Sequence, residues 1–249
     1  MNELSVKTLS APDLVSLWER CCRLSDIQRT LALASLVVSE SQPLDAAALS
    51  IGERDRRLFA LRRELFGPTL KCLTTCPLCE ETLEFRMDID NDLPAGDRAH
   101  SPPLTLKAQS YEVTWRLPTS ADLKILSALE SPDVNRKKLL TRCVLSARQG
   151  EKGVVAEELP EDVIEVIEGA MAEADPCADL NVSLTCPSCS RSWQTPVDIG
   201  LFLWREIQAF IVRLFGDVHT LASAYGWSEE FILGLSTERR DAYLRMIRR

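Results

Sequence analysis

The sequence contains nearly the same short segment twice, as TCPLCEETLEFRMDI at residues 75–89 and as TCPSCSRSWQTPVDI at residues 185–199. Cys76 falls on Cys186 at an offset of 186 − 76 = 110. The same offset also aligns Thr75 with Thr185, Pro77 with Pro187, Cys79 with Cys189, Leu83 with Trp193, Asp88 with Asp198, and Ile89 with Ile199. Each copy therefore predicts a C-P-x-C knuckle that leads into a short strand, and Pro196 makes the second strand an edge or broken strand.

The two cysteine pairs predict one shared metal site. A structural zinc ion takes four tetrahedral ligands, often thiolates, and each C-x-x-C turn supplies two of them. The pairs are separated by 186 − 79 − 1 = 106 residues, which is more than in compact zinc ribbons. Because the flanking sequences also match, we expect the two knuckles to meet as a pseudo-symmetric pair around one structural Zn²⁺. The predicted ligands are Cys76, Cys79, Cys186 and Cys189.

Two other interpretations of these cysteines stay open. C-P-x-C is also the pattern of thiol–disulfide oxidoreductases, in which a helix N-terminus lowers the pKa of one thiol. Here both motifs lead into extended sequence, and a duplicated redox motif is unusual. The cysteines could instead be unmetallated or form separate partial sites. The remaining cysteines are scattered and are expected to be small core residues: Cys21, Cys22, Cys72, Cys143 and Cys177.

Nothing in the sequence predicts catalysis. A closed four-thiolate site has no open position for water or substrate. His100 and His219 are the only histidines, and neither lies in a ligand pattern. The sequence has no nucleophile elbow, phosphate-binding glycine loop or dinucleotide fingerprint. We therefore expect a protein that is not an enzyme.

The composition is that of a globular protein: 45% of the 249 residues are hydrophobic and 27% are charged. The formal net charge of −8 disfavours broad binding to nucleic acid, which needs a positive field. No apolar run is long enough to span a bilayer, and the N-terminus lacks an apolar signal core. The expectation is a cytoplasmic protein that does not enter the membrane.

The pattern along the chain predicts an α+β fold that is mainly α. Helices are expected at about 12–22, 26–38, 50–66, 120–130, 133–147, 160–174 and 199–225, with a β-hairpin at 104–117 and two short helices after Gly226. The predicted organisation is an N-terminal helical region (1–70), a zinc-ribbon-like element (71–92 and 180–199), an inserted β-hairpin with helices (93–179) and a C-terminal helical region (200–249).

The C-terminal helices are the expected protein-binding region. The stretch LASAYGWSEEFILGLSTERRDAYLRM (221–246) has the rhythm of a helix–turn–helix, and the residues that follow Ser236 are locally basic. With a zinc ribbon, this leaves a DNA-binding regulator as the alternative, although the acidic chain has no basic recognition face. The residues expected to contact a partner are Trp204, Phe210, Trp227 and Phe231.

Four segments resemble a known family: SIGERDRRLFALRRELFGPTLKCLTTCPLC, VTWRLPTSADL, DPCADLNVSLTCPSCSRSWQTPVDIGLFLWREI and VHTLASAYGWSEEFILGLSTERRDAYLRMI. Together they are similar to the T-even-phage-type baseplate hub assembly chaperones, as found with phage-tail-like extracellular contractile injection systems. The likeness covers most of the chain from about residue 49 onward.

The resemblance implies a non-enzymatic chaperone or accessory component for the baseplate of a contractile particle. Such a protein would bind a hub, wedge or spike component and keep it soluble, staying in the particle or leaving it. Zinc pairs suit the zinc-containing members of this group. The sequence identifies neither the direct partner nor the oligomeric state.

Overall fold

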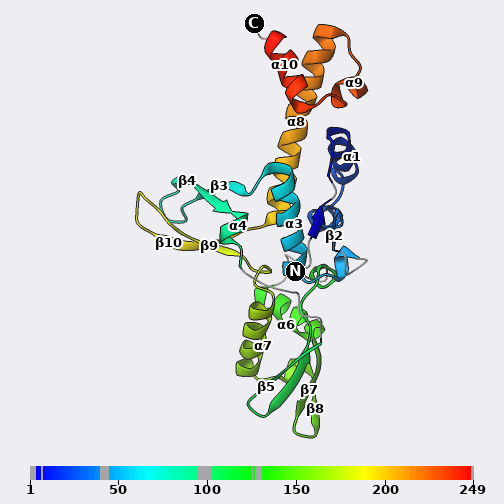
Figure 1. Ribbon diagram of the computed structural model, residues 1–249. Coiled ribbons are helices and arrows are strands. Elements are labelled where there is room, and N and C mark those ends of the chain that lie inside the picture. Colours follow the sequence, from blue (N-terminus) through cyan, green and yellow to red (C-terminus); the bar gives the residue numbers. More distant parts are fainter. Residues whose placement is uncertain are drawn as a thin grey trace.

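The computed structural model describes residues 4–6, 8–39, 45–94, 103–124, 126 and 131–247. Figure 1 shows four parts: a helical body, a side arm of two β-hairpins, an inserted module at one end and a helical tip at the other. Helices predominate and every sheet is small and antiparallel, so the expected α+β class is confirmed.

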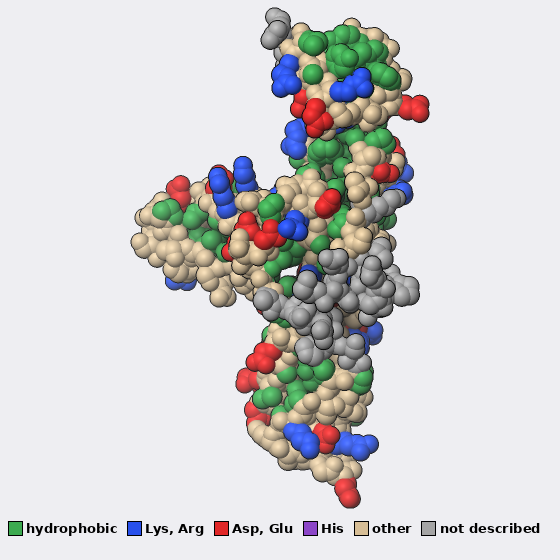
Figure 2. Space-filling model, viewed as in Figure 1, with side chains coloured by type: hydrophobic (Ala, Val, Ile, Leu, Met, Phe, Trp, Pro, Cys, Tyr) green, Lys and Arg blue, Asp and Glu red, His purple; other side chains and the backbone are tan. Residues whose placement is uncertain are grey.

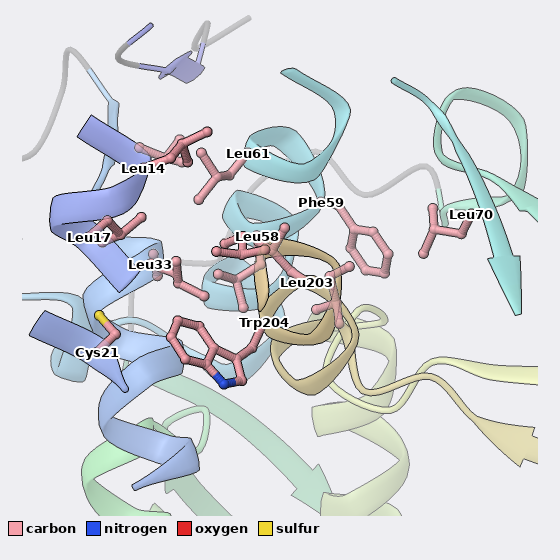
Figure 3. Packing of buried hydrophobic residues seen from close by; sticks show 14 of the residues in the cluster. Leu14, Leu17, Cys21, Leu33, Leu58, Phe59, Leu61, Leu70, Leu203 and Trp204 are labelled. Carbon is pink, nitrogen blue, oxygen red and sulfur yellow. The ribbon is translucent and has the colours of Figure 1, made fainter. Parts of the chain in front are cut away.

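The helical body packs three helices around the first half of the long helix α8 (Ile199–Tyr225). These are α1 (Ala11–Cys21), α2 (Asp26–Ala34) and α3 (Ile51–Phe66). Figure 3 shows Leu203 of α8 meeting leucines of α2 and α3 in the middle of this core. Each fully buried leucine contributes about 1.5–3 kcal/mol, so this cluster holds the N-terminal and C-terminal parts together.

A partly buried ion pair also joins α3 to α8. Arg62 donates hydrogen bonds from Nε and Nη2 to the two carboxylate oxygens of Glu206, each at 2.9 Å. The Arg62 side chain is 4% exposed, and it also donates to the carbonyl oxygen of Gly67 at the end of α3. A paired, fully hydrogen-bonded guanidinium can be buried, whereas an unpaired one is costly.

The side arm consists of two two-stranded sheets. The first hairpin joins β3 (Thr69–Thr75) to β4 (Thr82–Asp88), followed by the short helix α4 (Ile89–Asp92). The second joins β9 (Asn181–Thr185) to β10 (Ser192–Pro196), which leads into α8. Within the described chain β10 pairs with β9 alone, so Pro196 ends an edge strand as expected.

The inserted module runs from β5 to α7 and has its own core. Its sheet has the order β5 (Leu104–Ala108), β6 (Tyr111–Trp115), β7 (Val144–Gln149) and β8 (Lys152–Val154). Its helices are α5 (Ser120–Leu123), α6 (Pro132–Cys143) and α7 (Glu161–Ala174), with a 3₁₀ turn η2 (Ala156–Glu158). Apolar side chains of the sheet, such as Val113 and Trp115, are buried together with Val163 and Ile167 of α7.

Three expected helices differ from the structure. The helix expected at 26–38 ends at Ala34, because residues 37–39 form strand β2 (Val37–Ser39), which pairs with β1 (Leu4–Val6). The helix expected at 133–147 ends at Cys143, and the chain continues as β7 paired to β6. The helix expected at 120–130 is α5, and residues 125 and 127–130 lie outside the described residues.

The other predicted helices and the predicted hairpin agree with the structure. Helices α1, α3, α7 and α8 and the β5–β6 hairpin lie where the periodicity places them. Gly226 ends α8 in the left-handed conformation, with φ +70°, and its N–H donates to the carbonyl of Ala222. Ser228 then caps α9 (Glu229–Leu233), and α10 (Thr237–Ile247) folds back along α8.

Candidate metal centre

The two knuckles have the same backbone conformation at matched positions. The N–H of Cys76 donates to the carbonyl of Glu81 at 2.9 Å, and the N–H of Cys186 donates to Arg191 at 2.8 Å. In each turn the fifth residue also donates back to the first cysteine's carbonyl, at 3.0 Å and 2.9 Å. The same two positions, Glu80 and Ser190, have left-handed φ angles of 61° and 58°. The C-P-x-C turn therefore imposes one strained geometry on both copies.

The turns bring the four sulfur atoms into one cluster. The Sγ atoms of Cys76 and Cys189 are 3.6 Å apart, as are those of Cys79 and Cys186. All four Sγ atoms lie within 4.8 Å of one another. A tetrahedral zinc site with Zn–S bonds of about 2.3 Å would place its sulfur atoms about 3.8 Å apart. The donor set and its spacing therefore fit a four-thiolate metal site.

The cluster also has the electrostatics of crowded thiols. Burial opposes ionisation of Cys76, but hydrogen bonds from the backbone N–H groups of Cys79 and Leu78 outweigh it and lower the pKa of Cys76 to about 6. For Cys79, the backbone N–H of Glu81 favours the thiolate, but Cys189, burial and the other thiols raise its pKa to about 12. Four thiolates need a cation between them, and a bound divalent metal would supply that charge.

The local structure around the cysteines differs from that of a thiol oxidoreductase. In those enzymes the motif begins a helix that follows a strand. Here each motif is the turn of a hairpin and leads into β4 or β10. Cys76 and Cys186 are each 1% exposed, while Cys79 is exposed at the outer side of the cluster.

The other cysteines are mostly core residues, as expected. Cys21, Cys72, Cys143 and Cys177 are buried, and Cys22 is half-buried at the end of α1. None of them joins the four-sulfur cluster within the described part of the chain.

The predicted partner contact through Trp204 is wrong. Its side chain is 3% exposed and belongs to the core of the helical body. Figure 3 shows it pointing from α8 toward α1 and α2, where the guanidinium of Arg29 lies 5.1 Å from its ring centre. Phe210 is half-buried and packs against Phe66 of α3, with ring centres 6.1 Å apart.

The other two predicted contact residues lie together at the tip. Trp227 packs against Phe231 at 5.2 Å and against Tyr243 at 4.8 Å, measured between ring centres. Tyr225 stacks on Trp227 at 4.7 Å. We call these four residues the tip aromatic cluster; two of them, Trp227 and Tyr243, pack against a small core of Leu221, Ile232 and Leu244. Figure 2 shows hydrophobic side chains over this end of the molecule.

Sequence reasoning missed Tyr225 and Tyr243 in this cluster. They lie on α8 and α10, and only the reversal of the chain at Gly226 brings them together, with ring centres 5.7 Å apart. The available signal was that reversal itself, because a glycine C-cap followed by an N-capping serine predicts two helices folded against each other. Phe231 is 50% exposed and Tyr225 is 39% exposed, so the cluster presents rings to the surroundings.

Comparison with known families identifies the family of this chain. The family described as T4 bacteriophage base plate protein matches residues 31–204, well over half of the sequence. The chain belongs to this base plate family. Its matched region contains α3, the side arm, the inserted module and all four clustered cysteines. Neither curated proteins nor solved structures gave a match. No helix among the described residues is long and apolar enough to cross a membrane.

Proposed function

We propose that this protein is a non-enzymatic assembly factor, or chaperone, or an accessory component, for the baseplate or hub of a contractile, phage-tail-like injection system. Membership of the base plate family carries the proposal. It would act in the cytoplasm on the assembling particle, by binding hub or spike proteins.

The tip aromatic cluster supports binding of a protein partner. Aromatic side chains dominate interface energetics because each buries a large area and loses little rotamer freedom. Here four rings form one continuous group, and Phe231 and Tyr225 are substantially exposed. The cluster lies at the C-terminal end of α8, a helix of 27 residues, at the opposite end of the molecule from the inserted module (Figure 1).

A structural zinc ion is the second part of the proposal. It would join the two hairpins through Cys76, Cys79, Cys186 and Cys189, which come from chain segments far apart in sequence. A closed set of four thiolates leaves no position for substrate, which supports a structural role. The ion would fix the arm, and through β10 the start of α8, without taking part in a reaction.

The proposal is tested by purifying the tagged protein from its native host during particle assembly and identifying bound proteins by mass spectrometry. We expect baseplate, hub or spike proteins to be recovered, and we expect Phe231→Ala to reduce their recovery. Val212→Ala is the matched control, because Val212 is a similarly exposed apolar side chain on α8 outside the cluster.

A second readout tests the chaperone role directly. The recovered hub or spike component is expressed alone and together with this protein, and its soluble fraction is compared. A component that is equally soluble in both cases would contradict chaperone activity and leave a structural accessory role. Recovery of DNA and transcription proteins without baseplate proteins would favour the DNA-binding alternative instead.

A further inference from the structure

The duplicated hairpins provide a comparison within one chain. In the first hairpin, alternate side chains of β3 and β4 face outward, and two adjacent rows of that face hold Leu73 opposite Glu84 and Lys71 opposite Arg86. All four side chains are exposed. We call them the arm face. At the offset of 110, the second hairpin has only uncharged residues in their places: Asn181, Ser183, Gln194 and Pro196.

The leucines of the first hairpin are not required by its fold. Leu73 is 73% exposed, and Leu78 in the knuckle turn is 67% exposed. Their counterparts in the second hairpin are Ser183 and Ser188, and that hairpin forms the same turn with the same hydrogen bonds. Exposed leucines add nothing to the core, so packing within this molecule does not account for these two.

The charges on the arm face are also unfavourable in the isolated chain. Lys71 and Arg86 are directly opposite each other, and like charges at such positions destabilise a sheet. Within the described residues neither cation has an ion-pair partner. The second hairpin avoids this repulsion by having an asparagine and a proline there.

The order of the two rows is complementary to itself. Consider two arm faces packed against each other, related by a two-fold axis that lies in the interface, parallel to the rows and midway between them. The Leu73–Glu84 row of each copy then lies opposite the Lys71–Arg86 row of the other. Each Glu84 then faces two cations, and each Leu73 packs on the aliphatic stems of Lys71 and Arg86. A nucleic acid would not suit this face, because its uniform negative charge would meet Glu84.

We propose that the arm face of the first hairpin is a self-association surface, whose partner is the same face of a second copy of this chain. Figure 1 shows the hairpins projecting sideways from the helical body. The face comprises only two short strands, so the contact belongs to the small, weak class of interfaces. We expect association in the micromolar range or weaker, strengthened when copies are concentrated on an assembling particle. The surface is separate from the tip aromatic cluster and does not depend on the chaperone proposal.

Sedimentation velocity of the full-length protein over a concentration series tests this proposal. We expect a concentration-dependent dimer in the wild type. Leu73→Ser, which copies the second hairpin, should raise the dissociation constant at least about tenfold, as should Glu84→Lys. Gln194→Lys places a lysine at the matching position of the second hairpin, with a charge change of one unit against two for Glu84→Lys, and it should leave association unchanged.

Mixing two charge variants distinguishes this geometry from any other contact. Glu84→Lys makes both rows positive, and the double variant Lys71→Glu with Arg86→Glu makes both rows negative. Neither should self-associate, but an equimolar mixture should form a heterodimer, because each row again faces its opposite. Unchanged circular dichroism spectra and metal content would show that the variants remain folded.

Three outcomes would overturn the proposal. A wild-type protein that stays monomeric at several hundred micromolar has no such dimer. Association that survives in both charge variants uses another surface. Charge variants that lose binding to a purified baseplate component, while the wild type stays monomeric, would assign the arm face to that component. Loss of the tip contacts by Phe231→Ala would affect none of these results.

Discussion

Replacing Gly52 by alanine should weaken the attachment of the inserted module to helix α3. The N–H of Gly52, in the first turn of α3, donates a hydrogen bond of 2.8 Å to Asp175, just after α7. The Asp175 side chain lies so close that a Cβ added at residue 52 would be 2.0 Å from its Oδ1 atom and 2.8 Å from the backbone nitrogen of Ala178. Only glycine fits between them.

The expected cost follows from these contacts. The alanine methyl must displace the Asp175 carboxylate, which is 4% exposed and would lose a charge-assisted hydrogen bond of about 1.5–3 kcal/mol. The Ser50 side chain also hydrogen-bonds to this carboxylate, and displacing the carboxylate would disturb that bond as well. Alanine is otherwise the better helix former by about 1 kcal/mol, which offsets part of the loss. We expect a net destabilisation of about 2–4 kcal/mol.

The assay compares this variant with a second glycine in a helix. At Gly216 of α8 an added Cβ would meet nothing within 4 Å, so Gly216→Ala should be neutral or stabilise by up to about 1 kcal/mol. Urea unfolding gives both changes, and amide hydrogen exchange should show faster exchange at the start of α3 and the end of α7 in Gly52→Ala alone. If Gly52→Ala is as stable as Gly216→Ala, the packing argument is wrong.

Two further predictions concern the cysteine cluster and a buried carboxylate. Cys186→Ser should lower the zinc content, measured by plasma mass spectrometry, from one ion per chain to a small fraction. It should also lower the melting temperature by more than about 10 °C, because a structural zinc contributes several kcal/mol to folding. Full zinc content and an unchanged melting temperature would rule out the shared site. Burial opposes ionisation of Asp122, but hydrogen bonds from Arg116, Arg142 and Thr119 outweigh it and hold its pKa well below the ordinary 3.8. The stability that ionised Asp122 contributes is therefore complete above pH 3.8 and is lost as the pH falls toward the folded-state pKa. Asp122→Asn should lower the free energy of unfolding by about 3 kcal/mol at pH 7. It should also flatten the acid dependence of stability in unfolding curves measured from pH 2 to 6.

The features predictable from the sequence carry their own local signals. Helix α3 is preceded by Ser50, whose side chain accepts from the N–H of Glu53, and it is followed by Gly67 with φ 83°. Helix α8 ends at Gly226 for the same kind of reason. The four-cysteine cluster was predictable because the segment is duplicated, and a duplicated half-site implies a meeting of halves.

The features that could not be predicted depend on partners distant in the chain. Residues 37–39 form a strand because residues 4–6 lie beside them, and residues 144–149 do so because β6 offers its edge. The local sequence pattern of these residues gives no information about their neighbouring strands β1 and β6. Trp204 shows the same limit: the helical period places it on an apolar stripe of α8, but only the packed position of α1 and α2 decides that this part of the stripe is covered.

Comparison of the two hairpins distinguishes the residues that the four-cysteine site requires from the residues that it does not constrain. Both copies keep the cysteines, the proline, the left-handed fifth residue and a following aspartate whose side chain caps the next helix, Asp88 for α4 and Asp198 for α8. These shared features are sufficient to build the turn and position its sulfurs. Where the copies differ, the knuckle geometry imposes no choice, so it does not require the leucine or the cations of the first hairpin. The shared features bring the four cysteines of the two halves together, and the features found only in the first half are the ones on which the proposed self-association rests.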